Sequence, residues 1–390
     1  MRGRTDRESR RNARIYLVGL GASALGDSAM SLVAGIWVKT LTGSSSAAAI
    51  TSVCVYAPSL LGPVAGMVAD RVRRRPLLVA VNLAAAALML PLLLVHSPGQ
   101  TWLIYVAMAG YGSAAALIDS AESGLFVTML PLPLRQRMNG VRMAIGESGK
   151  LIAPLLGAGL YVLAGGGLVA ALDATTFLVA GFALLMLRVH EPVPQPPDRH
   201  WREELVAGFA HIRHTPPLRT IMIAGALAMA ITGAAEAGKY GLVDALHRPP
   251  SFLGLITGAL GAGSIIAGLV SGSLIRRVGE RRLVLLGLLN SVAGTVLRMI
   301  PTVPTALLGG FVLGFALPWT IVGVINLTQR KTPDALQGRV AAAVTLALFA
   351  PLPLTQAAGA LAIAHLDYRV LYGITALATL STAIWLARRG

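Results

Sequence analysis

The sequence predicts an all-α integral membrane fold with twelve transmembrane helices, and three observations lead to this prediction. Hydrophobic residues make up 55% of the 390-residue chain and charged residues only 13%, whereas a soluble domain carries about 25% charged residues. The apolar residues fall in runs long enough to cross a bilayer core of about 30 Å, which takes roughly 20 helical residues. The basic residues gather between these runs, as they do in membrane proteins.

Each predicted helix is one of these apolar runs. The first follows an arginine-rich tail and is too long for the apolar part of a cleaved signal peptide, so we expect it to be retained. Several runs exceed 20 residues, which indicates tilted helices or helices that extend beyond the lipid. In chain order the predicted helices are 15–40, 48–69, 77–95, 101–129, 139–164, 167–188, 218–245, 251–275, 283–300, 303–328, 338–364 and 370–387.

The charge of the connections alternates along the chain. Of the 33 lysines and arginines, 27 fall in the N-terminal tail, the loops after the second, fourth, eighth and tenth helices, the middle segment and the C-terminal end. The opposite face receives only Lys39, Arg248, Arg298 and Arg369. The positive-inside rule therefore predicts a multi-pass protein of the cell membrane with both termini in the cytoplasm. Topology accounts for the net charge of +16, and no stacking aromatics interleave the basic tracts, so we expect no nucleic-acid partner.

The chain divides into four predicted parts: a cytoplasmic basic tail at 1–14, a six-helix half at 15–188, a cytoplasmic linker at 189–217 and a second six-helix half at 218–390. The linker opens with four prolines that prevent helix continuation. Apolar residues then recur at helical spacing, which predicts an amphipathic helix on the inner membrane surface. The alternative is a loosely structured linker. The apolar positions are Trp201, Leu205, Phe209 and Ile212.

The two halves read as a repeat. The segment 66–75 after the second helix aligns without a gap with 272–281 after the eighth, and Asn139-Gly140 corresponds to Gln337-Gly338. Two six-helix halves related along the membrane normal are a known transporter plan, with the substrate site between them.

The loop after the second helix resembles the signature of the major facilitator superfamily. The resemblance implies that this loop gates the cytoplasmic side, whereas a solvated loop would explain its arginines alone. We expect Gly66 to allow close helix packing and Asp70 to cap the next backbone turn and pair with arginines. The matching residues are Gly66, Asp70, Arg71, Arg74 and Arg75, with Arg73 in place of the usual second glycine.

Other motifs are similar to the macrolide-efflux and siderophore-exporter branch of that superfamily. They are Gly26-Asp27, Asn139-Gly140 and the segment 173–177. The fifth helix resembles the antiporter signature of exporters. Its small residues and its proline would let the helix pack closely and bend. Ordinary small-residue packing is the alternative. The helix-5 motif comprises Glu147, Gly149, Lys150, Pro154 and Gly157.

Acidic residues inside the predicted spans mark candidate proton and substrate sites, because ionisable groups in a membrane are costly. The resemblance implies that helices 1, 4, 7 and 10 line the central cavity, which places Asp27, Asp119, Glu122 and Glu236 there. Asp119 and Glu122 share one helix face, and two close carboxylates in a low dielectric predict that one holds a proton. The alternative is that both are hydrated near the cytoplasmic end.

Two Glu-x-x-Lys spacings predict local ion pairs. We expect Glu147 with Lys150 to be structural, and Glu236 with Lys239 to belong to the cavity. Asp173 is predicted to be a structural group near the outer end of its helix. The arginine common in the fourth helix of the superfamily is absent.

These observations predict a secondary active transporter rather than an enzyme. No phosphate-binding loop or catalytic constellation is present, and the single cysteine, Cys54, with no Cys/His cluster, predicts neither metal nor cofactor. The predicted activity is proton-coupled export of a hydrophobic or amphipathic small molecule, such as an antibiotic, natural product or siderophore, by alternating access. Its partners would be that molecule, protons and the lipid bilayer, and we expect a monomer. The alternatives are uptake or facilitated flux of a small metabolite, and a non-transporting receptor or scaffold.

Overall fold

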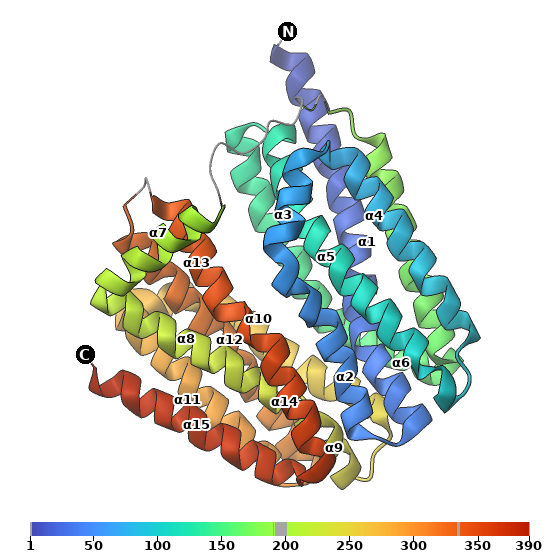
Figure 1. Ribbon diagram of the computed structural model, residues 1–390, viewed down its shortest axis with the longest axis vertical. Coiled ribbons are helices and arrows are strands. Elements are labelled where there is room, and N and C mark those ends of the chain that lie inside the picture. Colours follow the sequence, from blue (N-terminus) through green and yellow to red (C-terminus); the bar gives the residue numbers. More distant parts are fainter. Residues whose placement is uncertain (1, 190, 192–200, 334–335, 390) are drawn as a thin grey trace. The chain divides into compact units, whose positions relative to one another are not determined.

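The computed structural model describes residues 2–189, 191, 201–333 and 336–389 (Figure 1). Over these residues the secondary structure is helical, without strands, as predicted. The chain forms two compact units: residues 1–42 with 54–198, and residues 43–53 with 199–390. The boundary falls inside the second predicted helix, so the start of that helix packs with the second unit.

The first unit is built on α1, which packs along α6, while α4 packs on α5 and α6. Its buried core joins α1, α4, α5 and the end of α6 through side chains that include Tyr16, Leu78, Leu125, Phe126 and Leu187. The elements are α1 (Arg2–Thr42), α2 (Ser45–Tyr56), η1 (Ala57–Leu61), α3 (Gly62–Arg71), α4 (Arg74–Met89), η2 (Leu90–Leu94), η3 (Pro98–Gln100), α5 (Thr101–Met129) and α6 (Leu132–Met186).

The second unit is centred on α12, which packs on α10 and α11, while α8 packs on α14 and α15. Its core includes Ile212, Leu218, Val284, Val324 and Leu348. The elements are α7 (Trp201–His214), α8 (Pro216–Ala235), α9 (Gly238–Ala245), η4 (Pro250–Phe252), α10 (Leu253–Val278), α11 (Glu280–Arg298), α12 (Val303–Lys331), α13 (Gln337–Phe349), α14 (Pro351–His365) and α15 (Tyr368–Arg388).

The predicted apolar runs are largely helical, although helix and run do not always coincide. Within the described residues, nine helices are long and apolar enough to span a membrane, or ten if the pair bent by 57° between α2 and α3 is one span. The remaining predicted spans are α11 and one arm of α6. The helix α6 contains both the fifth and sixth runs, which are separated where Gly165 adopts φ 76°. Positive φ is accessible to glycine at little steric cost, so the two arms of α6 meet at a kink there. The protein is therefore a multi-pass membrane protein.

The predicted amphipathic linker helix corresponds to α7, although 199 and 200 lie outside the described residues. Ile212 is buried in the core of the second unit, and a Cβ on Gly208 would lie 2.3 Å from the Arg339 carbonyl oxygen. The helix thus docks closely on α13. Val206 is 67% exposed on its outer face.

Candidate functional site

A cavity of about 140 Å³ lies inside the first unit, where α1, α4, α5 and α6 meet. The three acids that the sequence assigned to this unit's site, Asp27, Asp119 and Glu122, all line it. The other lining residues with polar groups are Tyr16, Ser23, Asn82, Tyr111 and Arg142. Carboxylates from two helices therefore face one space.

Glu122 is held by two neighbours. The Tyr16 hydroxyl donates a hydrogen bond of 2.8 Å to its Oε2 atom, and the Arg142 Nη2 atom lies 3.8 Å from the same oxygen. The guanidinium of Arg142 lies 5.2 Å from the ring centroid of Phe126, close enough for a cation–π interaction. Glu122 thus has both a hydrogen-bond donor and a counter-ion.

Arg142 was missed as a site residue by sequence reasoning. Because Arg142 follows Asn139-Gly140, it was grouped with the basic residues of the loop after the fourth predicted helix. In the structure it belongs to α6 and supplies a cation to the acids of α5, where the superfamily's usual helix-4 arginine is absent. The signal was a cation inside a predicted span that is adjacent to a span with two acids.

Asp119 precedes Glu122 by one helical turn on α5. It lines the cavity and is exposed, whereas the Glu122 side chain is only 12% exposed. The two carboxyls of one helix face therefore have different environments, one open and one enclosed.

Asp27 lies beside a second buried acid, Asp173 of α6. The Ser23 hydroxyl donates to Asp27 Oδ2 at 3.1 Å, and the Thr176 hydroxyl lies 3.3 Å from Asp173 Oδ1. A Cβ on Gly26 would lie 2.4 Å from Asp173 Oδ1. Asp173 is 1% exposed and lies eight residues after the break at Gly165, so this carboxyl is directed at α1 inside the unit, and its structural role stays a prediction.

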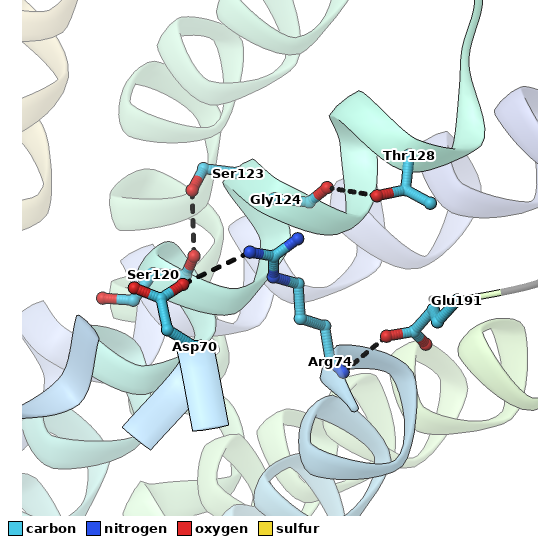
Figure 2. Close-up of polar contacts among 7 residues, drawn as sticks. All are labelled: Asp70, Arg74, Ser120, Ser123, Gly124, Thr128 and Glu191. Atoms are coloured by element: carbon cyan, nitrogen blue, oxygen red, sulfur yellow. Dashed lines mark hydrogen bonds and ion pairs between the residues drawn. The ribbon is translucent and has the colours of Figure 1, made fainter. Parts of the chain in front are cut away.

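The signature loop packs by contacts shown in Figure 2. Asp70 pairs with Arg74 at 3.3 Å, and the carboxylate of Glu191 accepts a hydrogen bond of 2.6 Å from the backbone N–H of Arg74 (Figure 2). The same carboxylate accepts a second hydrogen bond, of 2.9 Å, from the backbone N–H of Arg75. Glu191, rather than Asp70, therefore caps the start of α4. It lies in the predicted linker, and sequence reasoning missed it because the contact spans more than a hundred residues.

Other loop residues have different surroundings. The Arg74 guanidinium lies over Gly124, where a Cβ would be 2.3 Å from its Cζ atom. Arg75 donates through Nε to the Leu184 carbonyl at 2.9 Å and also donates to the Leu185 carbonyl. A Cβ on Gly66 would meet no atom within 4 Å, so the described contacts show no close packing there, and Arg71 is exposed.

The helix-5 motif brings α6 close to α1. A Cβ on Gly157 would lie 2.9 Å from Ala29 Cβ, and one on Gly149 would lie 3.3 Å from the Ala24 carbonyl oxygen. Pro154 lies inside the helix. The side chains of Glu147 and Lys150 are outside those that the structure describes.

Glu236 and Lys239 belong to the second unit, at the break between α8 and α9. They form an ion pair, and Lys239 Nζ lies 5.3 Å from the centroid of the Tyr240 ring. Glu236 also lines a small hollow with Ser52, Tyr240 and Gln356. The pair is therefore described within the second unit, and its place in a shared cavity stays a prediction.

Comparison with known proteins agrees with this architecture. The sequence matches the Major Facilitator Superfamily over residues 16–238 and 237–389. The multidrug efflux pump Tap of Mycolicibacterium fortuitum is 26% identical over 359 residues, covering 85% of this chain and 86% of that protein. An uncharacterized MFS-type transporter, YfiS of Bacillus subtilis (strain 168), is 22% identical over 303 residues, covering 73% and 70%.

Solved structures share the fold at low sequence identity. A bacterial homologue of the iron transporter ferroportin, in an inward-facing state, has a TM-score of 0.73 at 17% identity and covers 97% of this chain and 98% of its own. The POT family transporter PepTSo has a TM-score of 0.76 at 11% identity and covers 97% of both chains. The chain therefore belongs to the major facilitator superfamily.

Proposed function

We propose that the protein is a proton-coupled exporter of hydrophobic or amphipathic small molecules that works by alternating access. The observation that carries the proposal is the cluster of Tyr16, Glu122 and Arg142 at an acid-lined cavity. The similarity to a multidrug efflux pump supports export over uptake.

The cluster supplies a physical basis for coupling. A proton on Glu122 removes the negative charge that attracts Arg142, which weakens the ion pair and releases the guanidinium. A cationic or hydrogen-bonding substrate competes with that proton for Glu122 and Asp119. A ligand that binds one protonation state better shifts the population toward it, and this mutual effect is what coupling requires.

We propose that the signature loop stabilises one conformation of the transporter from the cytoplasmic side. Asp70 with Arg74 and the Glu191 carboxylate on the start of α4 hold the loop to the linker. Charge-assisted hydrogen bonds are about twice as strong as neutral ones, so these contacts stabilise the conformation of the transporter in which they are formed. We further propose that both termini lie in the cytoplasm.

Transport assays test the proposal in cells that express the protein. Efflux of fluorescent hydrophobic cations and macrolides is measured with and without a protonophore, for wild type, Asp119→Asn, Glu122→Gln and the control Glu203→Gln on the exposed side of α7. We expect efflux to stop with the protonophore and to fall in the two cavity variants but not in the control. Efflux that persists with the protonophore contradicts proton coupling, and accumulation in place of efflux contradicts export.

A further inference from the structure

Asp27 and Asp173 form a pair of carboxyl groups in the interior of the first unit. Asp27 directly follows Gly26, where a Cβ would lie 2.4 Å from Asp173 Oδ1. Each carboxyl has one oxygen near a hydroxyl, Ser23 for Asp27 and Thr176 for Asp173. The other oxygens, Asp27 Oδ1 and Asp173 Oδ2, are buried and have no hydrogen-bond partner among the residues that the structure describes.

The groups around this pair come from four helices and include little positive charge. On α1 they are Tyr16 and Ser23, on α4 Asn82, on α5 Tyr111, Asp119 and Glu122, and on α6 Thr176 and Arg142. Among the described residues that line the cavity, Arg142 is the only cation, and it is paired with Glu122. The Asn82 amide donates one hydrogen bond, of 2.7 Å, to the Leu78 carbonyl.

Two ionised carboxylates in this place would be costly. Like charges held close together in a low dielectric oppose one another's ionisation, and a buried charge needs a partner to offset its lost hydration. One proton answers both conditions, because it lowers the charge of the pair to −1 and supplies a donor to oxygens that have none.

We propose that Asp27 and Asp173 share a single proton and form a second proton site, next to the cavity of the transport cluster. Asp27 lines the cavity, so the proton can pass to water there, with cleavage of one O–H bond and formation of another on water. The role in transport rests on the proposed function, whereas the shared proton itself does not.

Infrared spectroscopy of the purified, lipid-reconstituted protein at neutral pH tests the pair without any substrate. An un-ionised carboxyl gives a C=O band that shifts in deuterated water, and we expect one such band to be lost equally in Asp27→Asn, in Asp173→Asn and in the double variant. Each asparagine amide would donate to the remaining carboxylate, which is why one substitution should be enough. Glu122→Gln should keep the band.

Several results would overturn the proposal. One is the absence of such a band in wild type, and another is survival of the band in the double variant. A third is that the losses in the two single variants add up to the loss in the double variant, which would mean two independent protonated acids. Binding of Mn²⁺ by wild type that is lost in Asp27→Asn would assign the pair to a cation instead. If Asp173→Asn does not fold, survival of the full band in Asp27→Asn still overturns the proposal. Protonophore-sensitive efflux is measured separately, so either proposal can fail without the other.

Discussion

At the scale of single residues, Arg142 supplies the positive charge among the described residues that line the cavity. It contributes the positive charge opposite Glu122 and lies over Phe126, and the planar guanidinium suits both contacts better than a lysine ammonium. Without it, the Tyr16 hydroxyl is the partner that this carboxylate keeps among the described residues. The ion pair therefore connects the protonation of Glu122 to the position of a side chain on α6.

Replacing Arg142 should separate its charge from its shape. We expect Arg142→Gln to reduce proton-driven efflux about tenfold or more, which corresponds to about 1.4 kcal/mol, and Arg142→Lys to retain part of the activity. The measurement is the initial rate of dye efflux, normalised to protein in the membrane, with Arg213→Gln on the exposed side of α7 as control. Wild-type efflux in Arg142→Gln would show that the ion pair has no part in coupling.

The comparison of sequence and structure is most informative at this scale. Asp27, Asp119 and Glu122 could be predicted because a carboxylate in an apolar run is conspicuous in the sequence. Arg142, Asp173 and Glu191 could not be placed, because their roles depend on partners on other helices: Glu122, Asp27 and the start of α4. Charge patterning shows that a group is unusual, whereas only tertiary packing shows what it faces.

At the scale of elements, hydropathy predicts the twelve helical runs but not the positions at which they are interrupted. The turn at Gly165 and the interruption between α8 and α9 lie within or beside apolar sequence, so hydropathy alone does not locate them. The helix-5 motif predicted that α6 would make a close helix contact, since small residues permit backbones to approach. The structure identifies α1 as the partner.

Two glycines of α6 provide a matched test of that contact. A Cβ on Gly157 would lie 2.9 Å from Ala29 Cβ and 3.0 Å from Ala29 Cα, whereas a Cβ on Gly159 would meet nothing within 4 Å. Overpacking costs about 1–3 kcal/mol, and glycine to alanine gains up to about 1 kcal/mol in helix propensity. We expect Gly157→Ala to lower the Tm in detergent and Gly159→Ala to leave it unchanged or raised. Equal Tm values would mean that α1 and α6 are not in close contact.

The repeat also preserves one contact between elements. Arg75 donates to carbonyls at the end of α6, and Arg281, its equivalent in the repeat, donates to the Leu386 carbonyl at the end of α15. In both units an arginine of the loop after the second helix therefore satisfies the orphan carbonyls at the end of the last helix.

Removing either arginine should destabilise its own unit. We expect Arg75→Ala and Arg281→Ala each to cost about 1.5–3 kcal/mol, the value of a hydrogen bond to a charged group. Arg71→Ala and Arg282→Ala, at exposed positions of the same loops, should have little effect. Thermal unfolding followed by fluorescence size-exclusion chromatography compares all four, and equal losses in the exposed variants would assign the effect to loop charge.

At the scale of the whole molecule, the two units share a plan but differ in chemistry. The first has Asp27, Asp119, Glu122 and Asp173 in or beside its cavity with Arg142 as counter-ion. In the second, Glu236 is paired with Lys239, and Arg298 is 8% exposed. The acids of the proposed proton sites therefore lie in the first unit.

The orientation of the whole chain in the membrane follows from its basic loops. Because loops rich in Lys and Arg remain in the cytoplasm, Val72 beside the arginines of the signature loop should face inward, and His96 in the loop before α5 should face outward. Both side chains are exposed, so each can report as a single cysteine once the native Cys54 is replaced by alanine. A membrane-impermeant maleimide should label His96→Cys in intact cells and Val72→Cys only after permeabilisation. Labelling in the reverse order would place both termini outside the cell and contradict the proposed orientation.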